Sequence, residues 1–236
     1  MSKNILPSDC VTIVFSLLFA TLALINIHES LSVLNLLILY MSFAVFQVFL
    51  IYHSKSSRFL MLTRDLIFPI VAVFSIFDSL TTLIPIVHPR DFDHILLEID
   101  LKIFGFYPTV YMQRFYHPIL SDVLQLCYSI YYFLPVIVGI ALKVKGLHRE
   151  FEEGLFLVLL CFYLSYLGYI IVPALGPRYA FAELHHYEIL DGYFSQQLRD
   201  LLNAIEGIKR DAFPSGHTAV SLLVLILSWR HAQRGT

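Results

Sequence analysis

The run from Leu31 to Tyr52 contains no charged side chain, and this feature restricts the fold more than any other. A hydrocarbon core of about 30 Å is crossed by about 20 residues of helix. Because lipid offers no hydrogen-bond partner to the backbone, a run of this kind must be helical. The stretches that meet this requirement are residues 11–27, 31–53, 66–88, 121–142, 153–175 and 213–230. We therefore predict an all-α fold, a polytopic membrane helix bundle with about six transmembrane helices.

The composition of the 236 residues excludes a water-soluble fold. Hydrophobic residues make up 58% of the chain and charged residues only 14%, whereas soluble domains average about 25% charged residues. The net charge of −2 gives no basic field, so no nucleic-acid partner is expected. Cys10, Cys127 and Cys161 lie far apart beside or within apolar runs, which predicts small buried side chains and neither disulfides nor a metal site. No small-residue cleavage site follows the first run, which favours a retained first helix.

The distribution of basic residues orients the predicted spans, because short cytoplasmic loops are enriched in Lys and Arg. The loops at 53–65 and 143–152 each contain three such residues, whereas the hairpin at 28–30 contains none. This pattern predicts a cytoplasmic N-terminus and places the segments 89–120 and 176–212 on the outer face. Both outer segments also contain apolar residues at helical spacing, at 92–104 and 187–206. We expect these to form amphipathic helices that lie in the membrane interface and cover a pocket.

The segment that opens the sixth predicted span contains the residues best suited to chemistry. Pro214 and Ser215 are typical of a helix start, where free backbone N–H groups and the positive end of the dipole attract anions. Gly216 allows an anion to approach the backbone. His217 follows within the first turn and is suited to donate a proton to a leaving oxygen. Together these residues predict a phosphate site with an acid beside it.

Another informative segment ends the fifth predicted span. Pro177 stops the helix, and Arg178 follows at the same membrane face as His217. A guanidinium in this position can bind a phosphate through two parallel hydrogen bonds.

At these residues the sequence resembles a known family. The Pro-Ser-Gly-His run at 214–217 and the Gly-Pro-Arg-Tyr run at 176–179 are similar to motifs of the type 2 phosphatidic acid phosphatases, which are related to vanadium haloperoxidases. The resemblance extends over roughly residues 66–230, and it is strongest to a bacterial membrane branch close to inositol-phosphotransferase-like proteins. The apolar runs predict two N-terminal transmembrane helices at 1–65, and the resemblance implies a partial lipid-phosphatase-like membrane domain at 66–236. It also implies a bacterial inner-membrane protein whose site faces the periplasm.

The resemblance implies a phosphohistidine mechanism without metal or other cofactor. By position, Arg178, Ser215 and Gly216 would bind the substrate phosphate, and His217 would protonate the leaving alcohol. The family's first motif has a lysine where this chain has Ile171, and Arg210 is our candidate to replace that charge, with Lys209 as an alternative. The partners expected are a membrane lipid substrate and the bilayer, with the oligomeric state left open.

One motif of the family is not matched. The third motif supplies the attacking histidine, and no part of this sequence resembles it. We therefore expect a chain that is truncated relative to its functional form and lacks the last two helices of the family fold. His185 and His186, followed by Asp191, are a weaker candidate source of a nucleophile, since a histidine pair in a loop is more often solvated.

Three further groups have ordinary interpretations. Asp78 lies within the third predicted span, where an acid suggests either function or a satisfied packing residue. The acids Asp91, Asp93 and Asp100 are predicted to form a solvated face, because their spacing does not surround one ion. The aromatic cluster at 128–133 is predicted to pack between helices and to anchor the interface.

Three function classes remain open from the sequence. The first is an enzyme that hydrolyses or transfers the phosphate of a lipid. The second is a catalytically inactive family member that binds lipid phosphates or scaffolds a partner, which the unmatched third motif favours. The third is a transporter of organic anions, which Asp78 and a helix-start anion site would suit, although no pair of interrupted helices repeats between the halves.

Overall fold

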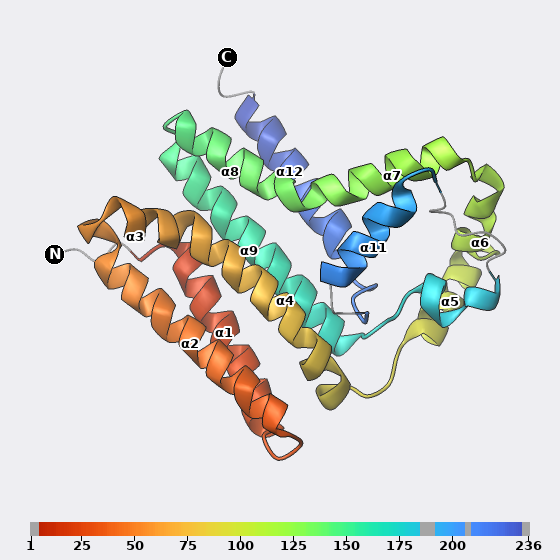
Figure 1. The fold of residues 1–236 in the computed structure, drawn as a ribbon, viewed down its shortest axis with the longest axis horizontal. Coiled ribbons are helices and arrows are strands. Elements are labelled where there is room, and N and C mark those ends of the chain that lie inside the picture. The colour runs from red at the N-terminus through yellow and green to blue at the C-terminus, as the bar shows by residue number, and fades with distance from the viewer. Residues whose placement is uncertain (1–4, 185–191, 206–208, 233–236) are drawn as a thin grey trace.

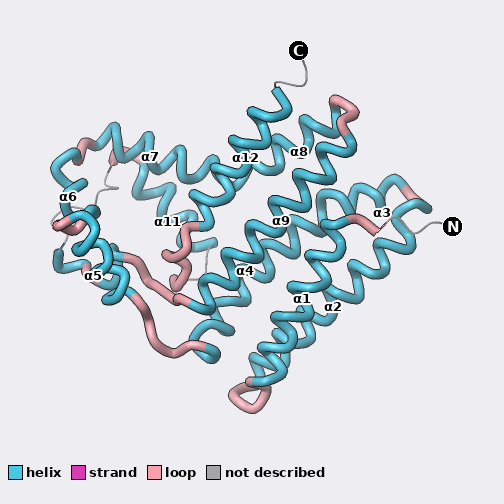
Figure 2. The backbone as a smooth tube through the Cα atoms, turned by 180° about the vertical axis from the view of Figure 1, so that it is seen from behind, coloured by secondary structure: helices cyan, strands magenta, loops and turns pink. Residues whose placement is uncertain are grey.

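The computed structural model describes residues 5–184, 192–205 and 209–232, and within these ranges all regular secondary structure is helical (Figures 1 and 2). The predicted all-α fold is confirmed. In chain order the elements are α1 (Pro7–Ile25), α2 (Leu31–His53), η1 (Ser54–Ser56), α3 (Arg58–Leu62), η2 (Thr63–Ile67), α4 (Phe68–Val87), α5 (Asp93–Phe104), α6 (Pro108–Met112), η3 (Gln113–Phe115), α7 (Pro118–Ile130), η4 (Tyr131–Phe133), α8 (Leu134–Val144), α9 (His148–Ile171), α10 (Pro177–Ala180), η5 (Ala182–Leu184), α11 (Ser195–Ile205) and α12 (Gly216–Ala232).

Five helical stretches in the described ranges are long and apolar enough to cross a membrane, judged by length and composition. They are Pro7–Ile25, Leu31–Ser56, Arg58–Val87, Pro118–Val144 and His148–Ile171. These correspond to the first five predicted spans. The sixth predicted span, 213–230, corresponds to α12, a helix of 17 residues. The first span begins earlier than predicted because Asp9 lies inside the helix, where an ion pair neutralises it.

Helix α9 is central to the bundle and contacts α1, α4, α8 and α12. Its aromatic side chains pack against the N-terminal helices and α4. Tyr163 stacks on Phe15 with ring centroids 5.3 Å apart, and Tyr166 Oη donates a hydrogen bond of 3.1 Å to the Val73 carbonyl. Both views show α1, α2, α4 and α9 side by side (Figures 1 and 2). The largest buried core cluster is built from these four helices.

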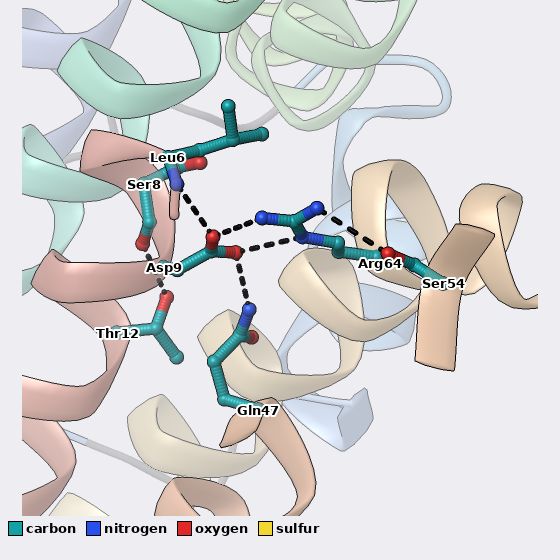
Figure 3. Close-up of polar contacts among 7 residues, drawn as sticks. All are labelled: Leu6, Ser8, Asp9, Thr12, Gln47, Ser54 and Arg64. Atoms are coloured by element: carbon teal, nitrogen blue, oxygen red, sulfur yellow. Dashed lines mark hydrogen bonds and ion pairs between the residues drawn. The ribbon is translucent and has the colours of Figure 1, made fainter. Parts of the chain in front are cut away.

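A buried ion pair fastens the N-terminal helices to the start of α4 (Figure 3). Asp9 on α1 and Arg64 in the π-helical turn η2 are 2% and 8% exposed and form a two-point pair. Asp9 also accepts hydrogen bonds from Gln47 Nε2 at 2.6 Å and from the Leu6 N–H at 2.8 Å. Arg64 additionally donates to Ser54 Oγ at 3.3 Å. Because both carboxylate oxygens are satisfied, this charge is stable in an apolar bundle.

Two further ion pairs tie helices together at the same end of the bundle. Lys143 Nζ at the end of α8 lies 2.5 Å from Asp65 Oδ2 in η2. Arg230 Nη1 near the end of α12 lies 2.5 Å from Glu153 Oε1 near the start of α9. The turn between α8 and α9 and the short helix α3 lie at this end, whereas α9 ends and α12 begins at the other (Figure 1). The basic loops and the predicted phosphate site therefore occupy opposite ends of the bundle.

The fourth predicted span, 121–142, is divided into two helices. The 3₁₀ turn η4 separates α7 from α8, and the ribbon bends at this point (Figure 1). Pro135, the second residue of α8, has no N–H to give to Tyr131, so a continuous α-helical ladder is broken here. The bend carries the tyrosines of η4 toward α12.

Both predicted outer segments contain helices. The segment 92–104 becomes α5, and its apolar face is exposed: Ile95, Ile99 and Ile103 are 53%, 44% and 68% accessible. An exposed apolar face of this kind is expected of a helix that lies in a membrane interface. The segment 187–206 is described in part, as α11, whose N-terminus is held by Asp122. The Asp122 carboxylate accepts the backbone N–H groups of Tyr193, Phe194 and Ser195 at 2.9–3.1 Å.

Candidate active site

The first turn of α12 is packed closely against α9. Ser215 caps the helix, since its Oγ accepts the Thr218 N–H at 3.3 Å. A Cβ at Gly216 would collide with the Tyr169 hydroxyl, and one at Gly168 would come within 2.6 Å of Pro214 Cγ. Two glycines on facing segments thus allow the helix start to approach α9. The sequence-based prediction that α12 begins at these residues is confirmed.

The His217 imidazole lies between tyrosine rings. Its centroid is 4.1 Å from that of Tyr128 and 4.2 Å from that of Tyr131, with Tyr132 edge-on at 5.7 Å. His217 Nε2 is buried and has no hydrogen-bond partner within the described ranges. Stacking therefore fixes the plane of the ring while one of its nitrogens stays available to a ligand. Sequence reasoning assigned these tyrosines to packing and interface anchoring. That assignment missed their contact with His217, because it depends on the bend at η4.

The loop that carries the first motif is held by a buried acid. Gly176 has φ 85°, a conformation that favours glycine, and it precedes α10. Asp93 Oδ1 accepts the Gly176 N–H at 2.8 Å and Asp93 Oδ2 accepts the Leu175 N–H at 3.0 Å. The backbone of Arg178 lies in α10, and its side chain falls outside the described part of the structure. The prediction that Asp93 belongs to a solvated face is wrong, since Asp93 is 6% exposed.

The loop that leads into α10, residues 173–178, carries the first motif, and the loop before α12, residues 209–215, carries the second; this first-motif loop and this second-motif loop meet directly. Ala212 donates its N–H to the Ala174 carbonyl at 3.1 Å, and Ala174 and Asp211 form an isolated parallel bridge. The backbone that leads into Arg178 therefore runs beside the backbone that leads into His217. This is the proximity that the sequence-based topology predicted.

Arg210 lies next to this bridge and is paired. Its Nε is 2.9 Å from Asp91 Oδ1, its Nη2 donates to Asp91 Oδ2 at 3.2 Å, and its Nη1 donates to the His88 carbonyl at 3.4 Å. Asp91 is thus a partner of Arg210 and not only a solvated acid. The guanidinium retains N–H donors beyond these bonds, since arginine has five.

An apolar cleft begins at these residues and extends through the bundle. Its cavity volume between α4, α8, α9 and α12 is about 120 Å³, and the cleft is partly open, with Asp211 and His217 toward one end and Asp65 toward the other. Phe151 and Tyr169 both line it, and at about 1.5 Å per helical residue they lie roughly 27 Å apart along α9. Burial raises the pKa of the Asp211 carboxyl to about 6. A cleft that is apolar along its length, with polar groups at its ends, is typical of a site for an amphiphile.

The remaining candidates lie elsewhere. His185, His186 and Asp191 fall outside the described residues. Asp78 is exposed on α4 and forms no hydrogen bond or ion pair with the other described residues. Its neighbour Ser79 is instead buried and hydrogen-bonded to Tyr40 at 2.6 Å. The interpretation of Asp78 as a satisfied packing residue is therefore not supported.

A comparison with known families matches the part of the chain that contains both motif loops. A model of the PAP2 superfamily matches residues 94–236, which is more than half of the chain and includes both motif loops and α12. The chain belongs to the PAP2 superfamily. The matched region begins one residue after Asp93 and excludes α1, α2 and α4. No curated protein and no solved structure matches the chain.

Proposed function

We propose that the protein is a membrane lipid phosphatase or phosphotransferase that acts on a lipid phosphate or pyrophosphate. The observation that carries this proposal is the position of His217 at one end of an apolar cleft within a helix bundle. The polar end is suited to a phosphate, because the positive end of the α12 helix dipole lies there and attracts an anion. The apolar length is suited to a hydrocarbon chain, which a soluble phosphoester lacks. PAP2 superfamily membership supports phosphatase-type chemistry at this end.

Each site residue has a separate role in the proposal. Ser215 and Gly216 bind the phosphate oxygens at the start of α12, and Arg178 binds them from the facing loop. Arg210, held by Asp91, contributes positive charge beside the bridge between the loops. His217, with one buried nitrogen lacking a partner among the described residues, donates the proton that the leaving oxygen requires.

The proposed reaction proceeds through a phosphohistidine. An attacking histidine forms the bond to phosphorus while the bond between phosphorus and the lipid oxygen breaks, and the His217 proton passes to that oxygen. Water then removes the phosphoryl group in a phosphatase, or an alcohol accepts it in a transferase. The resemblance assigns the attacking histidine to the family's third motif, which these 236 residues do not match. All steps use charge and proton transfer by side chains, so no metal or other cofactor is required.

The orientation proposed for the bundle places this site at the outer face of a bacterial inner membrane, with a cytoplasmic N-terminus. Supporting this, the basic loops lie at the end opposite to the start of α12, which contains His217 (Figure 1). The partially exposed apolar face of α5 lies on the same side as the site, where an interfacial helix would contact the outer leaflet.

The proposal is tested with phosphatidic acid in mixed detergent micelles as the probe. We expect orthophosphate release that EDTA does not change and that vanadate inhibits. His217→Ala should lose turnover and retain vanadate binding, because the loop that binds phosphate is left in place. Full turnover in this variant would refute the role of His217, and loss of turnover with EDTA would indicate a metal enzyme.

A second candidate function is binding without turnover, and the unmatched third motif favours it. In that case the wild-type chain binds vanadate and the lipid phosphate but releases no orthophosphate. The two functions therefore differ in one measurement on the same preparation. Absence of both binding and turnover would contradict both of them.

A further inference from the structure

Three backbone segments that are remote in sequence meet at the site. They are residues 91–93 at the start of α5, the first-motif loop and the second-motif loop, and residues 91–93 contact both loops. Phe92 donates its N–H to the Pro173 carbonyl at 2.8 Å. Asp93, the first residue of α5, accepts the N–H groups of Leu175 and Gly176. The first-motif loop is thus attached to α5 by three hydrogen bonds. Two of these bonds end on a single buried carboxylate.

The bond to Gly176 acts on the element that contains Arg178. The Gly176 carbonyl accepts the N–H groups of Tyr179 and Ala180 at 3.0 and 2.9 Å, so Gly176 is the residue from which α10 begins. By fixing the N–H of this residue, Asp93 sets the direction in which α10 leaves the loop. Arg178 lies in the first turn of α10, so its backbone position depends on Asp93.

The second-motif loop is attached to the same segment. Asp91 and Arg210 form a two-point ion pair, with side chains 27% and 22% exposed. The Ala212 N–H in turn bonds to the Ala174 carbonyl of the first-motif loop. Each of the three segments therefore contacts both of the others.

We propose that Asp93 is a positioning residue of the phosphate site, which it serves by joining the first-motif loop to the second. This inference rests on the proposed function, because it concerns how the proposed phosphate site is held in place. Asp93 touches no reacting atom. It acts through Gly176 on Arg178, and through the Ala174–Ala212 contact on the backbone that leads to His217. Only a carboxylate accepts both N–H groups at once, because an amide would direct its own N–H₂ at one of them.

The first measurement is hydrogen–deuterium exchange of the full chain in detergent. In Asp93→Asn, we expect exchange to rise by about tenfold or more in the peptide 173–181, because each lost bond to a charged acceptor is strong. We expect a rise also in the peptide 209–214, whose Ala212 N–H does not touch Asp93. The peptide 7–25 in α1 should be unchanged. Unchanged exchange at 209–214 would overturn the proposal.

The matched control is Glu98→Gln, a carboxylate on the same helix whose side chain is 72% exposed. It should alter neither peptide. If Asp93→Asn does not fold, Asp93→Glu keeps the charge and shifts it by one methylene, and the same two peptides should exchange faster by a smaller factor.

The second measurement is vanadate affinity, which does not require turnover. Asp93→Asn should bind vanadate about tenfold more weakly than wild type, and Glu98→Gln should bind it equally well. Equal affinity in Asp93→Asn together with faster exchange would show that the contact is structural only and would overturn the positioning role. If the wild type binds no vanadate, the proposed function fails, and exchange at 209–214 still decides whether Asp93 joins the two loops.

Discussion

Asp211 is expected to reduce stability at neutral pH, and this cost can be measured. The carboxyl lies in the wall of an apolar cleft, and burial raises its pKa from 3.8 to about 6. Each unit of pKa difference between folded and unfolded states corresponds to about 1.36 kcal/mol, so the shift corresponds to a cost of roughly 3 kcal/mol. Below about pH 4 both states hold the proton and no cost exists. The loss of folding stability grows as the pH rises from about 4 to 6, and above pH 6 it remains constant.

The perturbation is Asp211→Asn, which removes the ionisation and nearly preserves the shape. At pH 7 we expect this variant to be more stable than wild type by up to about 3 kcal/mol, with the difference falling to near zero at about pH 3.5. Unfolding by SDS in mixed micelles can be followed through Trp229, which is the single tryptophan of the chain and lies on α12. Asp200→Asn removes an exposed carboxylate from α11 and is the matched control.

A stability difference that stays constant between pH 3.5 and pH 7 would refute this reasoning, because only a difference in proton binding produces the pH dependence. A difference of opposite sign at pH 7 would show that the ionised carboxylate has a partner in the folded state. The control variant should show no change in the pH profile.

Substitutions at Tyr131, Gly216 and Asp9, each with a control variant, test the packing around the site and the N-terminal helices. Tyr131→Leu should slow turnover by about 2- to 12-fold, the equivalent of an aromatic contact of about 0.5–1.5 kcal/mol, whereas Tyr131→Phe keeps the ring and should retain turnover in the phosphatidic acid assay. Gly216→Ala should lower the midpoint of SDS unfolding, because its Cβ meets the Tyr169 hydroxyl, and Tyr169→Phe in the same chain should restore most of the loss. Asp9→Asn should lower the free energy of SDS unfolding by about 3–5 kcal/mol, because it leaves Arg64 buried without its charge partner. The double variant Asp9→Leu, Arg64→Met should recover much of this stability. An equal loss in the single and double variants would contradict the pairing.

The elements of the bundle could be predicted from the sequence because the relevant signals are local. Apolar runs uninterrupted by charge give helices wherever lipid forbids unpaired backbone, so the first five spans agree with the structure. The start of α12 was predictable from Pro214 and Ser215 for the same reason, since capping depends on neighbours within one turn. The break between α7 and α8 has a local cause in Pro135. The hydrophobicity of residues 121–142 alone nevertheless does not reveal this break, because α7 and α8 together are about as long as one membrane span.

The contacts that build the site are not local, and this is why sequence reasoning misjudged several of them. Asp93 and Gly176 are far apart in the chain, so the spacing of acids around Asp93 contains no sign of the loop that it holds. Tyr131 reaches His217 only because the chain bends at η4 and α12 packs beside it. Asp9, at the opposite end of the bundle, is a similar case. In the sequence, a single acid before an apolar run indicates the start of a membrane span, and only the structure shows that Arg64 pairs with Asp9 inside the bundle.

The positions of Asp9, Asp91 and Asp93 indicate how the parts of the chain depend on one another. Asp9 and Arg64 attach α1 and α2 to the start of α4, and α4 packs on α9, whose far end leads into the first-motif loop. Asp91 and Asp93 follow α4 and hold that loop and the second-motif loop. The segments that fix both loops therefore lie before residue 94, where the family match begins. A fragment restricted to the matched residues would keep Ser215, Gly216 and His217 but lose the carboxylates that hold the backbone around them, so we expect such a fragment to bind vanadate much more weakly than the whole chain.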